Sequence, residues 1–289
     1  MGLEPKNLES SIPVPSVQEL ASLKLETVPS RYIRDDMDSI IGTVPSGKTL
    51  RVPLIDMAKL VDSASQETEL QNKLEFFDLP LKEKKRWAQK PGSLEGYGQA
   101  FVTSEEQKLE WNDMIFLKAL PIEDRNLEIW PENPPKFRES LDRYSQDMRQ
   151  IAVALTRFMA MGLEIESQEL YDAYEEGLYQ IRMNYYPPCP QPERVTGLNP
   201  HVDIAGFALL LDCGDAPGLQ VLKDDHWIFV EPLDGAIVVT WGRSQRVGLA
   251  KELIKLGSPP LYKTVTVEEY IGCFFNRKLE VPFIDAMKI

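Results

Sequence analysis

A chain of 289 residues can bury a large hydrophobic core, either as one extended domain or as two modest ones. Its net charge of −13 argues against nucleic acid as a partner, because a negative field repels phosphate, and no apolar run approaches the roughly 18 residues that a membrane helix needs. Its three cysteines, odd in number and far apart, indicate free thiols in a reducing compartment, so we expect a cytoplasmic protein.

The first part of the chain is predicted to combine an outer N-terminal segment with helices. Residues 1–50 are interrupted by prolines and are expected to wrap around the outside of the domain. The strongest helix runs from Phe137 to Met159, where apolar side chains recur at three- and four-residue spacing and form one face that supports the core. The other elements predicted here are a helix around 17–25, a strand at 51–57, helical structure at 70–89 broken at Pro80, a strand at 111–120 and a short helix at 169–176.

The sequence period changes after Tyr179. Short apolar runs, each bounded by turn residues, replace the helical spacing, and residues 223–226 are predicted to form the turn of a hairpin. Closely spaced strands of this kind are typical of a sandwich or a jelly roll. The predicted strands are 180–186, 207–213, 219–222, 227–230 and 236–241, and a helix at 267–279 follows them.

The chain has two histidines, so any histidine-dependent chemistry uses His201 or His226. His201 belongs to the triplet His201-Val202-Asp203. On a strand, side chains two residues apart project from the same face, so we expect the imidazole and the carboxylate to point together. Such a pair is two-thirds of the His-carboxylate-His set that leaves open positions on non-haem iron. The triplet alone is a weak signal, and its surroundings give it weight.

Several motifs surround the triplet in a fixed order. They are RMNYYPPCPQPE at 182–193, GLNP at 197–200, GLQV at 218–221, WIFVEP at 227–232 and GAIVV at 235–239. The series resembles the plant iron(II)- and 2-oxoglutarate-dependent dioxygenases of specialised metabolism, especially the senescence-related and alkaloid O-demethylase group. The motifs EGYGQ at 95–99 and Glu110-Trp111 extend the resemblance over nearly the whole chain.

This resemblance implies an α+β fold in which flanking helices support a double-stranded β-helix (jelly-roll) core. By the family pattern the core is incomplete here, because expected segments are missing. The implied regions are an N-terminal extension (1–50), an N-terminal dioxygenase region with the long support helix (51–175), a truncated jelly-roll core (176–245) and a C-terminal segment with a helix (246–289).

The resemblance also implies roles for individual residues. His201 and Asp203 match iron(II) ligands, and Tyr186 and, less directly, Asn184 match residues that hydrogen-bond 2-oxoglutarate; ascorbate is the expected reductant. No catalytic residue beyond the metal ligands is implied. For Tyr186 the alternative is plain alternation of rings across a strand, and residues 95–101 either line the approach to the pocket or form a simple glycine-rich loop. The implied reaction is hydroxylation or O-demethylation of a small hydrophobic plant metabolite, coupled to decarboxylation of 2-oxoglutarate to succinate.

The chain departs from the family pattern in two places. The family carries a second histidine on a later strand, followed by an Arg-x-Ser clamp for 2-oxoglutarate. Here no histidine follows His226, and Arg243-Ser244 lacks the intervening residue, so roughly 50 residues are missing; roughly 30 more are missing after residue 71. Because the resemblance resumes on the far side of each gap, omitted coding segments explain the pattern better than gradual divergence. His226 is an alternative ligand, although a polar hairpin turn favours a solvated surface residue.

These gaps predict consequences for stability and for chemistry. Each buried Val, Leu, Ile or Phe contributes about 1.5–3 kcal/mol, against a net stability of about 5–15 kcal/mol, so the loss of two or three strands predicts a poorly folded or association-prone protein. A two-ligand site without the clamp predicts absent or vestigial activity. The alternative function is a non-catalytic derivative that binds a small molecule or a protein, while a cupin-like enzyme of another chemistry would need more histidine ligands.

Overall fold

The computed structural model describes residues 11–35, 37, 75–99, 101–102, 104–162, 168–203, 206–212, 218–223, 226–233 and 235–242. The predicted strand at 51–57, the predicted helix at 267–279 and the Arg243-Ser244 pair lie outside these residues. None of the helices described is both long and apolar enough to cross a membrane.

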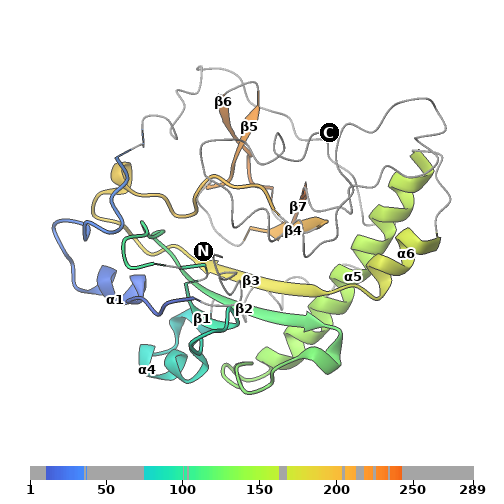
Figure 1. The fold of residues 1–289 in the computed structure, drawn as a ribbon, viewed down its shortest axis with the longest axis horizontal. Helices are drawn as coiled ribbons and strands as arrows, with labels where there is room; N and C mark the ends of the chain where they lie inside the picture. Colours follow the sequence, from blue (N-terminus) through green and yellow to red (C-terminus); the bar gives the residue numbers. More distant parts are fainter. Residues whose placement is uncertain are drawn as a thin grey trace, which may run out of the picture.

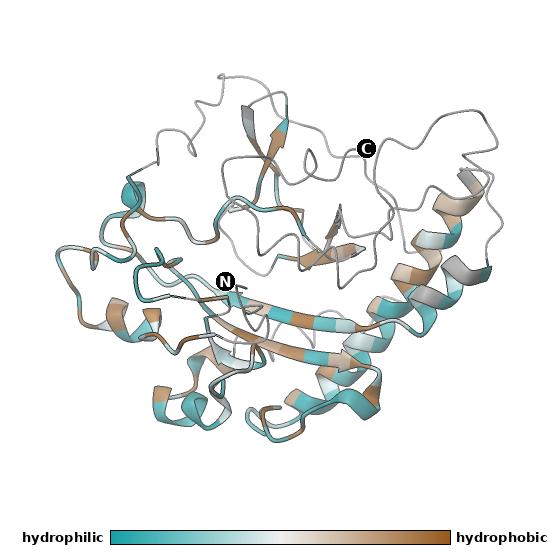
Figure 2. Cartoon of the chain, in the orientation of Figure 1, coloured by the Kyte–Doolittle hydropathy of each residue, from teal (hydrophilic) through white to brown (hydrophobic). Residues whose placement is uncertain are grey.

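A three-stranded antiparallel sheet forms the centre of the molecule (Figure 1). Its strands are β1 (Gly96–Gly98), β2 (Asp113–Leu120) and β3 (Tyr179–Tyr185), in the order β1-β2-β3. Ile115 pairs with Met183 and Leu117 with Ile181, so these side chains share one face of the sheet. Apolar and polar residues alternate along β3 (Figure 2), so one face of this strand contacts the core and the other carries the polar side chains Gln180, Arg182 and Asn184.

The long helix α5 (Phe137–Gly162) confirms the strongest helical prediction. Its first turns carry Phe137 and Leu141 into the core that covers the apolar face of the central sheet. Further along, Tyr144, Met148 and Ile151 form a second cluster, against which apolar side chains of β4 and β7 pack. One helix therefore supports both the central sheet and the strands of the second half.

The second half of the chain forms two separate antiparallel pairs. Strand β4 (Phe207–Leu211) pairs with β7 (Ile237–Trp241), and β5 (Gln220–Lys223) pairs with β6 (His226–Phe229). All four strands fall within two residues of their predicted ends, and the register that pairs Lys223 with His226 confirms the hairpin. The β4–β7 pair lies above β3 in the view of Figure 1.

The N-terminal segment is fastened to the start of β2 by a buried carboxylate. Helix α1 (Val17–Ser22) begins after Ser16, and the carboxylate of Asp113 accepts hydrogen bonds from the backbone N–H groups of Val17 and Gln18 at 2.7 and 2.9 Å. The Ser16 hydroxyl donates to the same carboxylate at 2.7 Å. The first turn of a helix leaves these backbone N–H groups without internal partners. The Asp113 carboxylate therefore caps the start of α1 and also attaches the helix to β2.

Two details differ from the predictions made on sequence. Residues 201–203 lie in an irregular segment and not on a strand; their side-chain contacts, rather than a sheet ladder, hold them. The glycine-rich segment at 96–98 is an edge strand instead of a loop. The described part of 70–89 divides at Pro80, as predicted, into short helical pieces. These pieces, with the shorter elements elsewhere, are helix at 75–78, α4 (Leu81–Lys84), η3 (Lys85–Trp87), η4 (Ile122–Asp124), α6 (Gln168–Glu175) and η5 (Pro192–Arg194).

Candidate functional site

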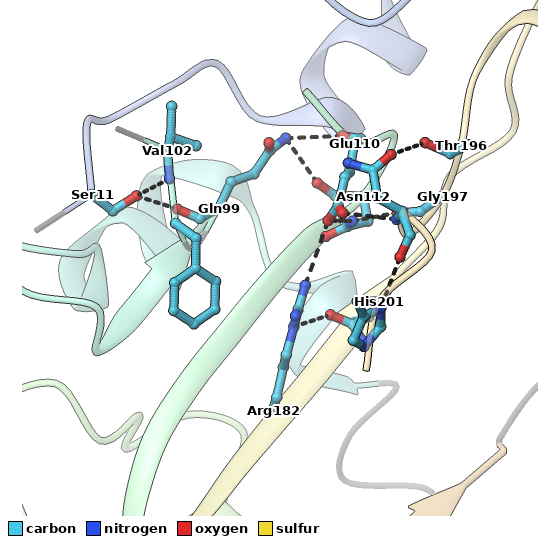
Figure 3. Close-up of polar contacts among 12 residues, drawn as sticks. Ser11, Gln99, Val102, Glu110, Asn112, Arg182, Thr196, Gly197 and His201 are labelled. Carbon is cyan, nitrogen blue, oxygen red and sulfur yellow. Dashed lines mark hydrogen bonds and ion pairs between the residues drawn. The ribbon is translucent and has the colours of Figure 1, made fainter. Parts of the chain in front are cut away.

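The chain beyond β3 returns to the start of β2 and brings His201 beside the polar face of the central sheet. After β3 the chain passes through the proline-rich segment 187–192, and the backbone N–H of Trp111 then donates to the carbonyl of Thr196 at 2.8 Å. The Trp111 indole N–H donates to the carbonyl of Pro187 at 3.0 Å. These two contacts fasten both ends of the returning segment to one residue next to β2. Figure 3 shows the end of this segment, with Thr196, Gly197 and His201, near Arg182 of β3.

His201 and Asp203 point at each other, although they do not lie on a strand. The Nε2 atom of His201 is 3.3 Å from Oδ1 of Asp203, and both side chains are partly exposed, 48% and 31%. The opposite ring atom, Nδ1, is 2.7 Å from the carbonyl oxygen of Asn199. The hydroxyl of Thr240, on β7, donates to Oδ2 of Asp203 at 3.0 Å. Each side chain is therefore held on one side by another residue, and the remaining atoms, Nε2 of His201 and Oδ1 of Asp203, face each other.

Asn199 is itself held by three contacts. Its backbone N–H donates to Oε1 of Glu110 at 2.8 Å. Its side-chain oxygen accepts from Nη1 of Arg34 at 2.6 Å and from the hydroxyl of Thr196 at 2.7 Å. The carbonyl that contacts His201 thus belongs to a residue with little freedom to move.

Glu110 connects this segment to the polar face of β3. Its second oxygen, Oε2, lies 3.7 Å from Nη2 of Arg182 and accepts from the side-chain amide of Asn112 at 3.3 Å. Arg182 also donates from Nε to the side-chain oxygen of Asn184 at 2.9 Å. Sequence reasoning missed these roles of Glu110 and Arg182, because both depend on contacts between distant segments; their presence inside the quoted motifs was the available signal.

The His201–Asp203 contact changes the protonation of both groups. The hydrogen bond to Asp203 raises the pKa of His201, against the opposing effect of burial, and the Asn199 carbonyl acts in the same direction as Asp203. The hydrogen bond from His201 lowers the pKa of Asp203, and the Thr240 hydroxyl adds to this. A metal that binds here must displace the shared proton, since imidazole coordinates in its neutral form.

Tyr186 and Asn184 lie on the same side of β3 as Arg182. Asn184 is the hydrogen-bond partner of Arg182, and Tyr186 follows the end of the strand with half of its surface exposed. The Tyr186 ring packs so closely on Gly197 that a Cβ atom at this glycine would lie 2.8 Å from it. The structure therefore gathers Asn184 and Tyr186 near the segment that leads to His201.

The alternative ligand, His226, is the first residue of β6 and pairs with Lys223 of β5.

The donor set suits iron. One imidazole nitrogen and one carboxylate oxygen, each with an outer hydrogen-bond partner, are ligands that non-haem iron(II) accepts. Within the part of the chain that the structure describes, no cluster of three or more His, Cys, Asp or Glu side chains could hold a metal ion. His201 and Asp203 together could thus offer two protein ligands to a metal ion.

Two family models match the chain. The model described as the 2OG-Fe(II) oxygenase superfamily matches residues 178–248, which include His201 and Asp203. The model of the N-terminal region of non-haem dioxygenases in morphine synthesis matches residues 70–133. The two matches cover the central sheet, the returning segment and the strands β4 to β7.

Characterised plant proteins are similar over almost the whole chain. Protein SRG1 of Arabidopsis thaliana is 34% identical over 350 residues, covering 97% of this chain and 98% of that protein. Oxoglutarate-dependent flavonoid 7-O-demethylase 1 of Ocimum basilicum is 34% identical over 352 residues, covering 99% and 94%. Codeine O-demethylase of Papaver somniferum is 33% identical over 270 residues, covering 81% and 74%.

The comparison with Protein SRG1 also shows a difference in length. It spans 350 positions, whereas 97% of the 289 residues amounts to about 280, so about 70 positions of the relative have no residue opposite them in this chain. The similarity nevertheless covers both proteins almost from end to end. The unmatched positions of Protein SRG1 therefore lie mostly inside the aligned region.

Solved structures confirm the predicted fold class. A crystal structure of JOX2 in complex with 2OG, Fe and JA superposes with a TM-score of 0.81 at 25% sequence identity, covering 97% of this chain and 99% of JOX2. A 2OG-Fe(II) oxygenase family protein from Caulobacter crescentus shares the fold at a TM-score of 0.51 and 23% identity, over 63% of this chain and 62% of that protein. The fold is the helix-supported jelly roll. By sequence and by fold, the chain belongs to the plant iron(II)- and 2-oxoglutarate-dependent dioxygenases of the 2OG-Fe(II) oxygenase superfamily.

Proposed function

We propose that His201 and Asp203 bind iron(II), in a chain whose turnover is low or absent. The observation that carries this proposal is the 3.3 Å approach of Nε2 of His201 to Oδ1 of Asp203, with the other side of each group held by a protein hydrogen bond. The reaction class is hydroxylation or O-demethylation of a small hydrophobic plant metabolite. The names of the flavonoid and codeine O-demethylases among the relatives support the second of these.

The site residues have two proposed roles, metal binding and 2-oxoglutarate binding. Iron(II) and 2-oxoglutarate, when bound, supply oxygen activation coupled to decarboxylation of 2-oxoglutarate to succinate. His201 directs Nδ1 to the Asn199 carbonyl, and Asp203 accepts from Thr240 through Oδ2. Nε2 and Oδ1, which contact each other in the metal-free protein, are the two atoms that would hold the metal once the proton between them is lost. Asn184 and Tyr186 lie at the end of β3, where they are the candidate partners of 2-oxoglutarate.

The sequence supports the proposal that turnover is impaired. No histidine follows His226, and Arg243-Ser244 is not an Arg-x-Ser clamp, so a second imidazole ligand and a bidentate partner for the 2-oxoglutarate carboxylate are both missing. The difference of about 70 positions from Protein SRG1 agrees with missing internal segments. A metal with two protein ligands is held more weakly than one with three.

Metal binding and succinate formation test the two parts of this proposal separately. Purified full-length protein should bind Mn(II), a redox-stable substitute for iron(II), and the affinity should fall at least tenfold in His201→Ala and in Asp203→Ala. His226→Ala should bind as the wild type does. Iron(II)-dependent succinate formation should be barely above background. Unchanged Mn(II) affinity in both ligand variants would refute the assigned site, and robust succinate formation would refute the impairment.

A second function is a non-catalytic derivative that binds a small molecule or a protein. The absence of a third metal-ligating side chain among the described residues favours it. Binding of 2-oxoglutarate or a hydrophobic phenolic ligand without any dependence on metal would support this function over the oxygenase.

A further inference from the structure

We propose that an N-terminal arm, residues 28–34, holds the segment that carries the metal site, and that Arg34 is the positioning residue that joins the arm to Asn199. The inference rests on the proposed function for its importance, because this segment carries His201. The contacts themselves involve no metal. They lead from the anchoring of the arm, through its packing, to the side chain of Arg34.

The arm is anchored to residues 104–109, which precede β2. The Arg31 guanidinium donates to the carbonyls of Ser104 and Gln107 at 2.8 and 3.2 Å. The backbone N–H of Leu109 donates in turn to the carbonyl of Arg31 at 2.9 Å. Side-chain and backbone contacts therefore support the arm from one side, so it can hold a neighbouring segment in place.

The arm and the returning segment share one apolar cluster. Tyr32 is 2% exposed, and its ring meets the ring of Trp111 edge-on, with the centroids 5.3 Å apart. Val195 of the returning segment belongs to the same cluster, and Trp111 donates from its backbone N–H to the carbonyl of Thr196. The aromatic side chain of the arm thus packs on the residue that fastens the returning segment.

Two backbone groups of the arm bind the returning segment directly. The N–H of Val28 donates to the side-chain oxygen of Gln191 at 2.9 Å, across 163 positions of sequence. The N–H of Arg34 donates to the carbonyl of Arg194 at 2.9 Å. Figure 1 shows the arm, in blue, beside this part of the chain. The arm therefore follows the returning segment toward Asn199.

The guanidinium of Arg34 extends this attachment to the metal site. Its Nη1 donates to the side-chain oxygen of Asn199 at 2.6 Å, and a charged donor makes this hydrogen bond stronger than a neutral one. The backbone carbonyl of the same Asn199 lies 2.7 Å from the ring of His201. A guanidinium has no lone pair to offer a metal, so Arg34 acts on the site through Asn199.

Amide hydrogen exchange on metal-free full-length protein measures this placement. The reporter is the backbone N–H of residue 199, which donates to Oε1 of Glu110. In Arg34→Ala its protection should fall about tenfold, because the segment opens more often, while helix α1 keeps its protection. Mn(II) affinity should also fall about tenfold.

A double-mutant cycle distinguishes action through Asn199 from general damage. Asn199→Ala removes the same contact from the other side and keeps the backbone N–H and carbonyl of that position, so it should lower protection and Mn(II) affinity at least as much. Adding Arg34→Ala to Asn199→Ala should then cause no further loss, because the guanidinium has already lost its acceptor.

Arg86→Ala is the matched control for the loss of an arginine. Its side chain is 66% exposed and contacts Glu83, away from the arm, so this variant should match the wild type in both measurements. An equal loss in Arg86→Ala would trace the effect to net charge and would overturn the inference.

The inference is also overturned if Arg34→Ala leaves the protection of residue 199 unchanged, or if its loss adds in full to that of Asn199→Ala. The same holds if the wild type binds Mn(II) and Arg34→Ala binds it equally well. The exchange measurement needs no metal, so its failure is distinct from failure of the proposed function. If the wild type binds no Mn(II) while protection falls as predicted, the proposed function fails and the placement of Asn199 by Arg34 stands.

Discussion

The central sheet and the strands β4 to β7 differ sharply in how they are buried. On β2, six of the eight residues are buried, and Met114, Ile115 and Leu117 are fully enclosed. On β4 and β5 no residue is buried, and Leu210, Leu222, Phe229 and Val239 expose large apolar surfaces. The central sheet thus contributes to an enclosed core, whereas the side chains of the described jelly-roll strands are only partly buried.

The proposed ligands His201 and Asp203 lie where these two regions meet. His201 is held from the well-packed side, through Asn199 and Glu110, whereas Asp203 is held from the poorly covered side, through Thr240 on β7. A site built in this way has one firmly placed ligand and one whose position depends on the weaker region. Because the contacts of Asp203 come from the weaker region, we expect any destabilisation of the strands β4 to β7 to displace Asp203 more than His201.

The largest expected effect is on folding, and it compares the same substitution in the two regions. Leu117→Ala removes a fully enclosed side chain from the central core and should lower the free energy of unfolding by about 2–5 kcal/mol. Leu210→Ala, at a β4 position that is 39% exposed, should cost about 1 kcal/mol or less. Denaturant unfolding measures both. Equal losses would contradict the contrast in burial.

A somewhat smaller effect is expected at the buried carboxylate of Asp113. Asp113→Ala leaves the N–H groups of Val17 and Gln18 without their acceptor and should cost about 3 kcal/mol, with early hydrogen exchange in helix α1. Asp124→Ala, at an exposed position in η4, is the matched control and should change the stability little. Retention of α1 protection in Asp113→Ala would show that other contacts dock the helix.

A more local effect is expected at Gly197, which separates the Tyr186 ring from the backbone of the returning segment. In Gly197→Ala the new methyl group would lie 2.8 Å from the ring and must displace it. If Tyr186 binds 2-oxoglutarate, the affinity for 2-oxoglutarate in the presence of Mn(II) should fall about tenfold, or 1.4 kcal/mol. Gly218→Ala, where the methyl group meets nothing within 4 Å, should bind normally. Equal affinities of the two variants would argue against a role for Tyr186.

The smallest expected effect is the pH dependence of the His201–Asp203 pair. The raised pKa of His201 means that its contribution to stability is present at low pH and is lost as the pH rises through its folded-state pKa. The lowered pKa of Asp203 means that its contribution is lost as the pH falls through its own folded-state value. The pair therefore stabilises the metal-free protein most between these two values, and His201→Gln should remove that maximum from a stability-against-pH profile. An unchanged profile would show that the contact contributes nothing.

The raised pKa of His201 also predicts how the affinity for a metal changes with pH. Mn(II) affinity should fall as the pH decreases through the raised pKa of His201, because the proton and the metal compete for one imidazole. Affinity that is constant through this range would show that His201 is not a ligand.

Local patterns in the sequence were sufficient for most of the described fold. The spacing of apolar residues predicted α5, and the alternation within short runs predicted β2, β3 and the β5–β6 hairpin. The approach of His201 to Asp203 was also predicted, although the reasoning assumed a strand where the chain is irregular. Side chains two residues apart can converge in an irregular segment when each is held from outside, as Asn199 and Thr240 do here.

Contacts between distant segments were beyond sequence reasoning. Nothing local to Glu110 indicates that its carboxylate meets the N–H of Asn199, 89 positions later, because the proline-rich return from β3 decides that meeting. The same holds for Thr240 and Asp203, which β7 brings together. The pairs that orient the site therefore emerge only from the folded chain.

The most direct test of the metal site is an anaerobic titration of full-length protein with iron(II) and 2-oxoglutarate, followed by the visible charge-transfer absorption that forms when 2-oxoglutarate chelates bound iron. We predict a weak band in the wild type that is lost in both His201→Ala and Asp203→Ala and is unchanged in His226→Ala. A wild type without the band, or a band of equal strength in both ligand variants, would contradict the assignment.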